Sequence, residues 1–171
     1  VTYTIPTSSI ANTPNSKAAL DYIKCIEKLK KYTDVFVVNV SSPNTSGLRD
    51  LQSPDALAPL LCAIIQASQK IPVLLKLSPD LSHEELKNAV LIAVENGISG
   101  FVLTNTTNFR PQGSVWPKEG GLSGAILAEK SKMALKQTIE ILKNRRKDLL
   151  IVSVGGISSL DDAKERLALG A

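Results

Sequence analysis

Residues 35–45 read VFVVNVSSPNT, an apolar, β-branched run that passes directly into asparagine, serine, proline and threonine. The apolar part predicts a short strand that is buried on both faces. The polar part begins where this strand ends. The same succession occurs at later strand signals, so that successive predicted strands carry a polar cluster at their carboxyl ends. The clusters lie at residues 39–45, 76–80, 104–107 and 155–158.

Strand and helix signals alternate along the rest of the chain. The other strand signals lie at residues 2–5, 73–75, 101–103 and 150–154. Capping residues and apolar periodicity predict the helices between them. These helices cover residues 16–31, 53–65, 82–97, 127–144 and 159–170. In the first of them the apolar stripe consists of Leu20, Ile23, Ile26 and Leu29.

This alternation, with fully apolar strands, predicts a parallel sheet covered by helices. A doubly wound open sheet and a (β/α)8 barrel both have this pattern. An open sheet concentrates its site at one switch point, usually after a glycine-rich turn, whereas here successive strands contribute to one face. The sequence contains neither a G-x-G-x-x-G nor a Walker A pattern. We therefore predict an α/β fold, a partial (β/α)8 TIM barrel with its site at the C-terminal ends of the parallel strands.

The length of the chain predicts one domain that is incomplete. A whole barrel needs about 250 residues and eight strands, whereas this chain has 171 residues. We expect a single incomplete barrel domain over residues 1–171, with at least three of the eight barrel strands outside it. The chain starts at Val1 without a methionine and stops at Ala171, where a strand should begin, so both ends are expected to be cut.

Composition excludes several classes of protein. The net charge of +4 is mild, and most lysines and arginines fall in helical stretches, so we expect solvated faces and no nucleic-acid partner. No apolar run is long enough to cross a bilayer. The single histidine, His83, is expected at the surface, and Cys25 and Cys62 are expected to be reduced thiols in the core. No metal site is predicted, because these residues share no ligand spacing.

Two of the polar clusters contain residues that suit a heterocyclic or anionic ligand. Asn39 and Asn44 can each donate and accept hydrogen bonds, which allows them to bind the amide and carbonyl edges of a ring. The alternative is an Asn/Ser-rich turn that only caps the next helix. Lys76 closes an apolar strand, so its ammonium group is expected to be partly buried. It either faces an anionic ligand or forms a structural ion pair.

The remaining clusters suit a phosphate and a small polar ligand. Residues 104–107 offer four polar side chains, and the alternative is a polar turn that leads into the long connection at residues 108–124, whose length suggests a lid-like or functional loop. Glycines at 120–124 and 155–156 allow backbone N–H groups to approach a phosphate, although tight turns use them too. Without a histidine, a cysteine pair or a carboxylate dyad in these clusters, hydrolytic triads and glycosidase chemistry are not expected. Redox chemistry would need a bound cofactor.

Taken together, five motifs in this order resemble the class 2 dihydroorotate dehydrogenases. They are VVNVSSPNTSGLR at 37–49, LKLSPDL at 75–81, TNTT at 104–107, GGLSG at 120–124 and SVGGI at 153–157. The resemblance implies oxidation of (S)-dihydroorotate to orotate in de novo pyrimidine biosynthesis, with electrons passed through FMN to a quinone. About a third of the barrel lies outside this chain, so residues 1–171 alone are expected to be inactive.

The resemblance also implies roles for individual residues. Ser42 would be the catalytic base that takes the proton from C5 of the substrate while hydride passes from C6 to N5 of the flavin. Class 1 members carry cysteine at this position, so Ser42 assigns the class. Asn44, Asn105 and Thr106 would hold the substrate carboxylate and ring amides. Asn39 would contact both substrate and FMN. The remaining FMN contacts implied are Lys76 (facing the flavin ring), Thr104, Gly124, Gly155 and Gly156, the last two near the phosphate.

The chain departs from the family pattern at two places. The family usually has an asparagine and a Gly-Lys-Asn run before the first helix, whereas residues 5–11 read IPTSSIA, and Ser153 stands where glycine is common. The resemblance implies peripheral association with the bacterial cytoplasmic membrane or the mitochondrial inner membrane, through an N-terminal helical pair that lies outside the chain. Two alternatives remain: a degenerate barrel that has lost FMN, and another phosphate-binding barrel enzyme, such as an isomerase.

Overall fold

The computed structural model describes residues 2–4, 15–117, 119–146 and 148–171. Its centre is a sheet in which all neighbouring strands are parallel and lie in sequence order, β1-β2-β3-β4-β5. A doubly wound sheet would reverse this order at a switch point, whereas a barrel continues it. The prediction of a partial barrel is confirmed. The strands are β1 (Thr2–Thr4), β2 (Val35–Asn39), β3 (Val73–Leu77), β4 (Gly100–Leu103) and β5 (Leu150–Ser153).

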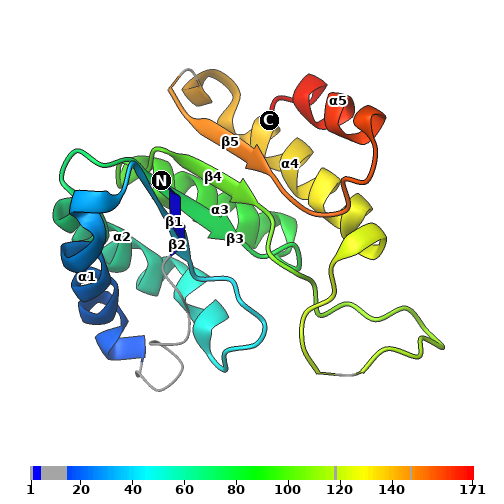
Figure 1. Cartoon of the computed structure of the whole chain (residues 1–171), viewed down its shortest axis with the longest axis horizontal. Helices are drawn as coiled ribbons and strands as arrows, with labels where there is room; N and C mark the ends of the chain where they lie inside the picture. The colour runs from blue at the N-terminus through cyan, green and yellow to red at the C-terminus, as the bar shows by residue number, and fades with distance from the viewer. Residues whose placement is uncertain (1, 5–14, 118, 147) are drawn as a thin grey trace.

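Helices connect successive strands, and α1 to α4 pack beside one another in sequence order, as the outer layer of a barrel does (Figure 1). The α-helices are α1 (Ala18–Leu29), α2 (Pro54–Ser68), α3 (His83–Glu95), α4 (Ala128–Leu142) and α5 (Leu160–Ala168). Short 3-10 helices are η1 (Asn15–Lys17), η2 (Lys30–Tyr32), η3 (Leu48–Gln52), η4 (Gly124–Leu127) and η5 (Lys143–Arg146). Among the described residues, none of the helices combines the length and apolar character that a membrane span requires.

The two faces of the sheet have different partners. Phe36 and Val38 of β2 are fully buried in the main core, which the helices share. Val37, Leu74 and Val102 form a second cluster, in which every buried or packed residue belongs to a strand. Because side chains alternate along a strand, β2 supplies both clusters at once. The second cluster occupies the face that forms the interior of a barrel.

Local capping signals place the starts of α3 and α5 where the sequence predicts them. Ser82 and Glu85 form a capping box at the start of α3, and Ser159 and Asp162 form another at the start of α5. Each box satisfies backbone N–H groups that the first helical turn leaves unpaired. Ser53 precedes the proline of α2, but its hydroxyl donates to the Asp50 carbonyl oxygen instead of capping the helix.

Two expectations about side-chain burial are wrong. Leu20 is 60% exposed, and the buried stripe of α1 consists of Ala18, Tyr22 and Ile26. Tyr22 can be buried because its hydroxyl donates a hydrogen bond to the Asn39 carbonyl oxygen over 2.9 Å. Cys62 is exposed on α2 and is not a core thiol, although both cysteines are free. The departure from the family pattern at residues 5–11 lies outside the described residues.

Candidate active site

Asn39 and Lys76 form the first part of the site, at the ends of adjacent strands. Asn39 pairs with Lys76 in the β2–β3 register, and Lys76 pairs with Val102 in the β3–β4 register. Both lie two residues beyond Val37 and Leu74, which belong to the strand-only cluster. Their side chains therefore point to the same interior side of the sheet. Figure 1 shows the segments that follow β2 and β4 at this same end of the sheet.

A hydrogen-bond network joins the ends of three strands. The Asn105 side-chain amide donates to Asn39 Oδ1 over 2.9 Å and to Ser41 Oγ over 3.1 Å. The Ser41 hydroxyl donates to the Lys76 carbonyl oxygen over 2.6 Å. The Thr106 backbone N–H donates to Asn105 Oδ1 over 2.8 Å. The structure therefore brings Asn39, Asn105 and Thr106 together with the backbone carbonyl of Lys76, and Ser41 joins them. The substrate and cofactor roles of the predicted residues stay predictions.

Ser42 follows this network directly and is 8% exposed. Its hydroxyl oxygen accepts a hydrogen bond from the Asn44 backbone N–H over 3.3 Å. Within the described ranges, no imidazole or carboxylate hydrogen-bonds to Ser42, and His83 is exposed at the first residue of α3. The Ser42 hydroxyl therefore retains its proton-donating and accepting capacity for a ligand or a water molecule.

Lys76 is half-buried, and burial lowers the pKa of its ammonium group. A buried ammonium usually has an anionic partner, since an unpaired one is costly. In the part of the chain that the structure describes, no carboxylate lies within ion-pair distance of Lys76. The structural ion pair is therefore not found among the described residues, and the ligand-facing role of Lys76 stays a prediction.

The long connection between β4 and α4 lies against the segment that follows β2 and contains Ser42 and Asn44. The Gly121 backbone N–H donates to Asn44 Oδ1 over 3.1 Å. A Cβ atom at Gly121 would lie 1.9 Å from Thr106 Oγ1, so only glycine allows this approach. Between the two segments is an open cavity of about 580 Å³. It is lined by Pro43, Asn44, Ser46, Asn108, Glu119 and Gly120.

The other predicted cofactor residues lie around the start of α4. Gly124 begins η4, which leads into α4, and Gly156 packs against Ala128, the first residue of that helix. The Gly155 carbonyl oxygen accepts a hydrogen bond from Ser131 Oγ over 2.7 Å. The Thr104 side chain is buried and donates to the Asn105 carbonyl oxygen over 2.9 Å. Within the described residues, no hydrogen bond joins Gly124, Gly155 or Gly156 to the asparagine network, and the FMN roles of these residues stay predictions.

Replacing Gly156 with alanine should destabilise the protein by about 1–3 kcal/mol, the usual cost of overpacking. The added Cβ would lie 2.3 Å from Ala128 Cα, and the backbone φ of 69° disfavours any side chain. Urea unfolding of the whole protein measures this cost. Gly97→Ala is the matched control, since φ is 82° but nothing lies within 4 Å of its Cβ. Equal losses in the two variants would show that packing on α4 is not the cause.

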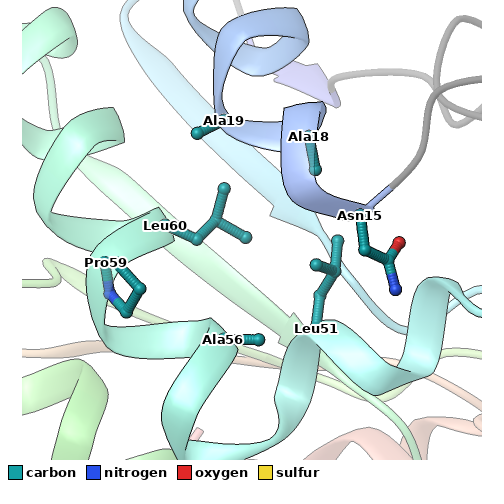
Figure 2. Close-up of a pocket in the computed structure, with 7 residues that line it drawn as sticks. All are labelled: Asn15, Ala18, Ala19, Leu51, Ala56, Pro59 and Leu60. Atoms are coloured by element: carbon teal, nitrogen blue, oxygen red, sulfur yellow. The ribbon is translucent and has the colours of Figure 1, made fainter.

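An apolar pocket of about 360 Å³ lies elsewhere, between α1, η3 and α2. Figure 2 shows Leu51 and Leu60 pointing into it, with Asn15 at its rim. The pocket contains no titratable side chain among its lining residues and is separate from the strand ends. We therefore place the candidate chemistry at the strand-end network and not in this pocket.

Sequence reasoning missed two charged residues that border the network, Arg49 and Asp80. Arg49 Nε donates to the Ser41 carbonyl oxygen over 3.2 Å, and Arg49 Nη1 contacts Asp80 Oδ2 over 3.1 Å. Both residues lie inside the motifs at 37–49 and 75–81, and their opposite charges after adjacent strands are the signal that would have found them.

Comparison with known proteins gives one consistent result. A family model described as dihydroorotate dehydrogenase matches residues 3–171. Proteins named dihydroorotate dehydrogenase (quinone) from Streptomyces avermitilis and Leifsonia xyli are 38% and 44% identical over 92% and 90% of this chain. The crystal structure of DHODH in complex with ferulenol from Eimeria tenella superposes with a TM-score of 0.82 at 29% identity, over 90% of this chain and 46% of that one. The chain spans about half the length of the curated relatives, 45% and 46% for the two named here.

Proposed function

The chain belongs to the dihydroorotate dehydrogenase family, and from this premise we propose that the protein containing it oxidises dihydroorotate to orotate in pyrimidine biosynthesis. The observation that supports the proposal is the strand-end network, in which Asn39 and Asn105 are hydrogen-bonded. Lys76 lies beside Asn39 and has no carboxylate within ion-pair distance among the described residues. Amide side chains suit the ring amides and carbonyls of a pyrimidine. A lysine without a carboxylate partner suits an anionic substrate or a ring that gains negative charge.

We propose FMN as the cofactor, because the residues present fit it. Lys76 supplies the cation that would face the flavin ring, with Asn39 and Thr104 beside it. Gly155 and Gly156 would lie near the phosphate at the start of α4, where backbone N–H groups favour an anion, and Gly124 would line the FMN site. When bound, FMN would supply the acceptor for the hydride from C6 of dihydroorotate.

The side chains of this chain would perform the proton chemistry and the positioning. Asn44, Asn105 and Thr106 would bind the carboxylate and ring amides of the substrate, and Asn39 would fix its orientation relative to the flavin. Ser42 would take the proton from C5. Serine is a weak base by itself, so the reaction needs a water molecule or neighbouring polar groups to carry the proton onward.

The same proposal extends to the electron acceptor and the location. Relatives named for quinone support a quinone acceptor. From this acceptor we propose a peripheral position on the bacterial cytoplasmic membrane or the mitochondrial inner membrane. The test is dihydroorotate-dependent quinone reduction by the whole protein, after its visible spectrum has been recorded. A flavin spectrum with turnover is the expected result. A colourless protein without turnover would support the degenerate barrel instead.

A further inference from the structure

Arg49 connects the segments that follow three different strands. Its Nε donates to the Ser41 carbonyl oxygen over 3.2 Å, and its Nη2 donates to the Thr106 carbonyl oxygen over 3.2 Å. Its Nη1 donates to Asp80 Oδ2 over 3.1 Å. Three arms of one planar guanidinium group therefore hold the ends of β2, β3 and β4 at fixed distances. A lysine could contact one of these groups as a point charge but could not bridge all of them.

Asp80 is the ion-pair partner of Arg49, and its side chain is 19% exposed. Besides Arg49, it accepts hydrogen bonds from Lys130 Nζ over 3.0 Å, from the Asn108 backbone N–H over 2.8 Å and from the Thr107 hydroxyl. Burial by itself would raise the pKa of the Asp80 carboxyl, but the hydrogen bonds from Thr107, Asn108 and Lys130 outweigh it, so the pKa is lowered. Asp80 is therefore an anion that joins the β4 segment and α4 to Arg49.

We propose that Arg49 and Asp80 are positioning residues, which set the placement of Ser42 and Thr106 relative to each other. This inference rests on the proposed function, because that function gives Ser42 and Thr106 their roles. Arg49 acts on the backbone carbonyl oxygen of Ser41, directly before Ser42, and on that of Thr106 itself. Since reactions at bound substrates depend steeply on placement, a shift of about 1 Å can lower a rate by about 100-fold.

Two variants test the positioning role. Arg49→Lys keeps the positive charge but loses the planar guanidinium group, and Asp80→Asn keeps the shape of the side chain but loses its negative charge. Both are made in the whole flavin-containing protein. Hydrogen exchange of residues 40–47 and 104–108 reports the placement directly, and stopped-flow reduction of the flavin by dihydroorotate reports its consequence. The control is Glu84→Gln, the same acid-to-amide change at an exposed pair in which Glu84 lies 3.6 Å from Lys87.

In Arg49→Lys and Asp80→Asn we expect faster hydrogen exchange at residues 40–47 and 104–108, and a rate constant for flavin reduction lowered by about 10- to 100-fold. The unfolding midpoint of Arg49→Lys should be near that of the wild type. Glu84→Gln should change neither the exchange nor the rate. If Asp80→Asn fails to fold, Arg49→Lys decides alone. Unchanged exchange in Arg49→Lys overturns the inference, and so does a rate within twofold of the wild type. If the wild type itself does not reduce its flavin, the proposed function fails, and the exchange data still decide whether Arg49 holds the two segments.

Discussion

Replacing Ser42 with alanine should lower the rate constant for flavin reduction by dihydroorotate by about 10²- to 10⁴-fold, the range that a general base contributes. The substitution removes one oxygen atom from a nearly buried site. The structural loss should be small, because the hydrogen bond that the hydroxyl oxygen accepts from the Asn44 N–H is long, at 3.3 Å. Such a hydrogen bond contributes about 0.5–1.5 kcal/mol to stability. The rate should therefore fall far more than the stability.

Stopped-flow absorbance of the whole protein, with the flavin content of each preparation determined first, separates these two effects. Ser53→Ala is the matched control, since it also removes one serine hydroxyl hydrogen bond, to Asp50 over 2.7 Å, but at the start of α2. It should reduce the flavin at the wild-type rate. If Ser42→Ala retains its FMN and a rate within about fivefold of the wild type, another group is the base.

The order of strands and helices could be predicted because its signals are local. The capping box of Ser82 and Glu85 spans one helical turn, and the apolar run of β2 is contiguous with the polar cluster that follows it. The choice of a barrel over an open sheet needed only the position of each polar cluster relative to its strand. Such signals depend on neighbours within a few residues, which the sequence displays directly.

The contacts that build the site depend on residues far apart in the chain. Tyr22 is 17 residues from Asn39, and Arg49 is 57 residues from Thr106. No periodicity fixes such pairs, because they arise from the register between strands and from how each helix is rotated on the sheet. This is why the apolar periodicity predicts Leu20 in the buried stripe of α1, whereas Tyr22, whose hydroxyl finds a hydrogen-bond partner there, occupies it.

The glycines show a second limit of sequence reasoning. Gly155 and Gly156 are predicted to allow approach of a phosphate, yet the structure gives Gly156 a different reason to be glycine, its contact with Ala128. A residue type selected by close packing leaves the same signal as one selected by a ligand. The asparagines differ in this respect, since Asn39 and Asn105 use polar groups at the ends of strands where packing alone would favour apolar side chains.

Replacing Lys76 with methionine should lower the rate constant for flavin reduction by about 10²- to 10³-fold, the effect of removing one group that stabilises developing charge. FMN should also bind more weakly, as measured by fluorescence when the protein is titrated with free FMN. Lys87→Met is the matched control, because it removes the same charge from an exposed position on α3. It should leave the rate and the FMN affinity unchanged.

Stability of the flavin-free protein distinguishes the two readings of Lys76. If Lys76 is an unpaired buried cation, Lys76→Met should be at least as stable as the wild type, because it removes a costly charge. If Lys76 belongs to a buried ion pair, the variant should lose about 3–5 kcal/mol. Denaturant unfolding at neutral pH measures the difference, and a loss of that size would contradict the ligand-facing role.

The pH dependence of the free energy of unfolding tests whether burial of the Lys76 ammonium group causes the difference between the two proteins. Burial places the pKa of Lys76 below its ordinary value of 10.5 in the folded protein. Between these two pKa values the unfolded chain binds more protons, so the free energy of unfolding of the wild type rises with pH across that window. Lys76→Met lacks this contribution. The amount by which its free energy of unfolding exceeds that of the wild type should therefore decrease as the pH rises through the pKa of Lys76 in the folded protein. A constant difference between the two proteins across this window would mean that burial does not depress the pKa of Lys76, and the unpaired cation would no longer account for its role.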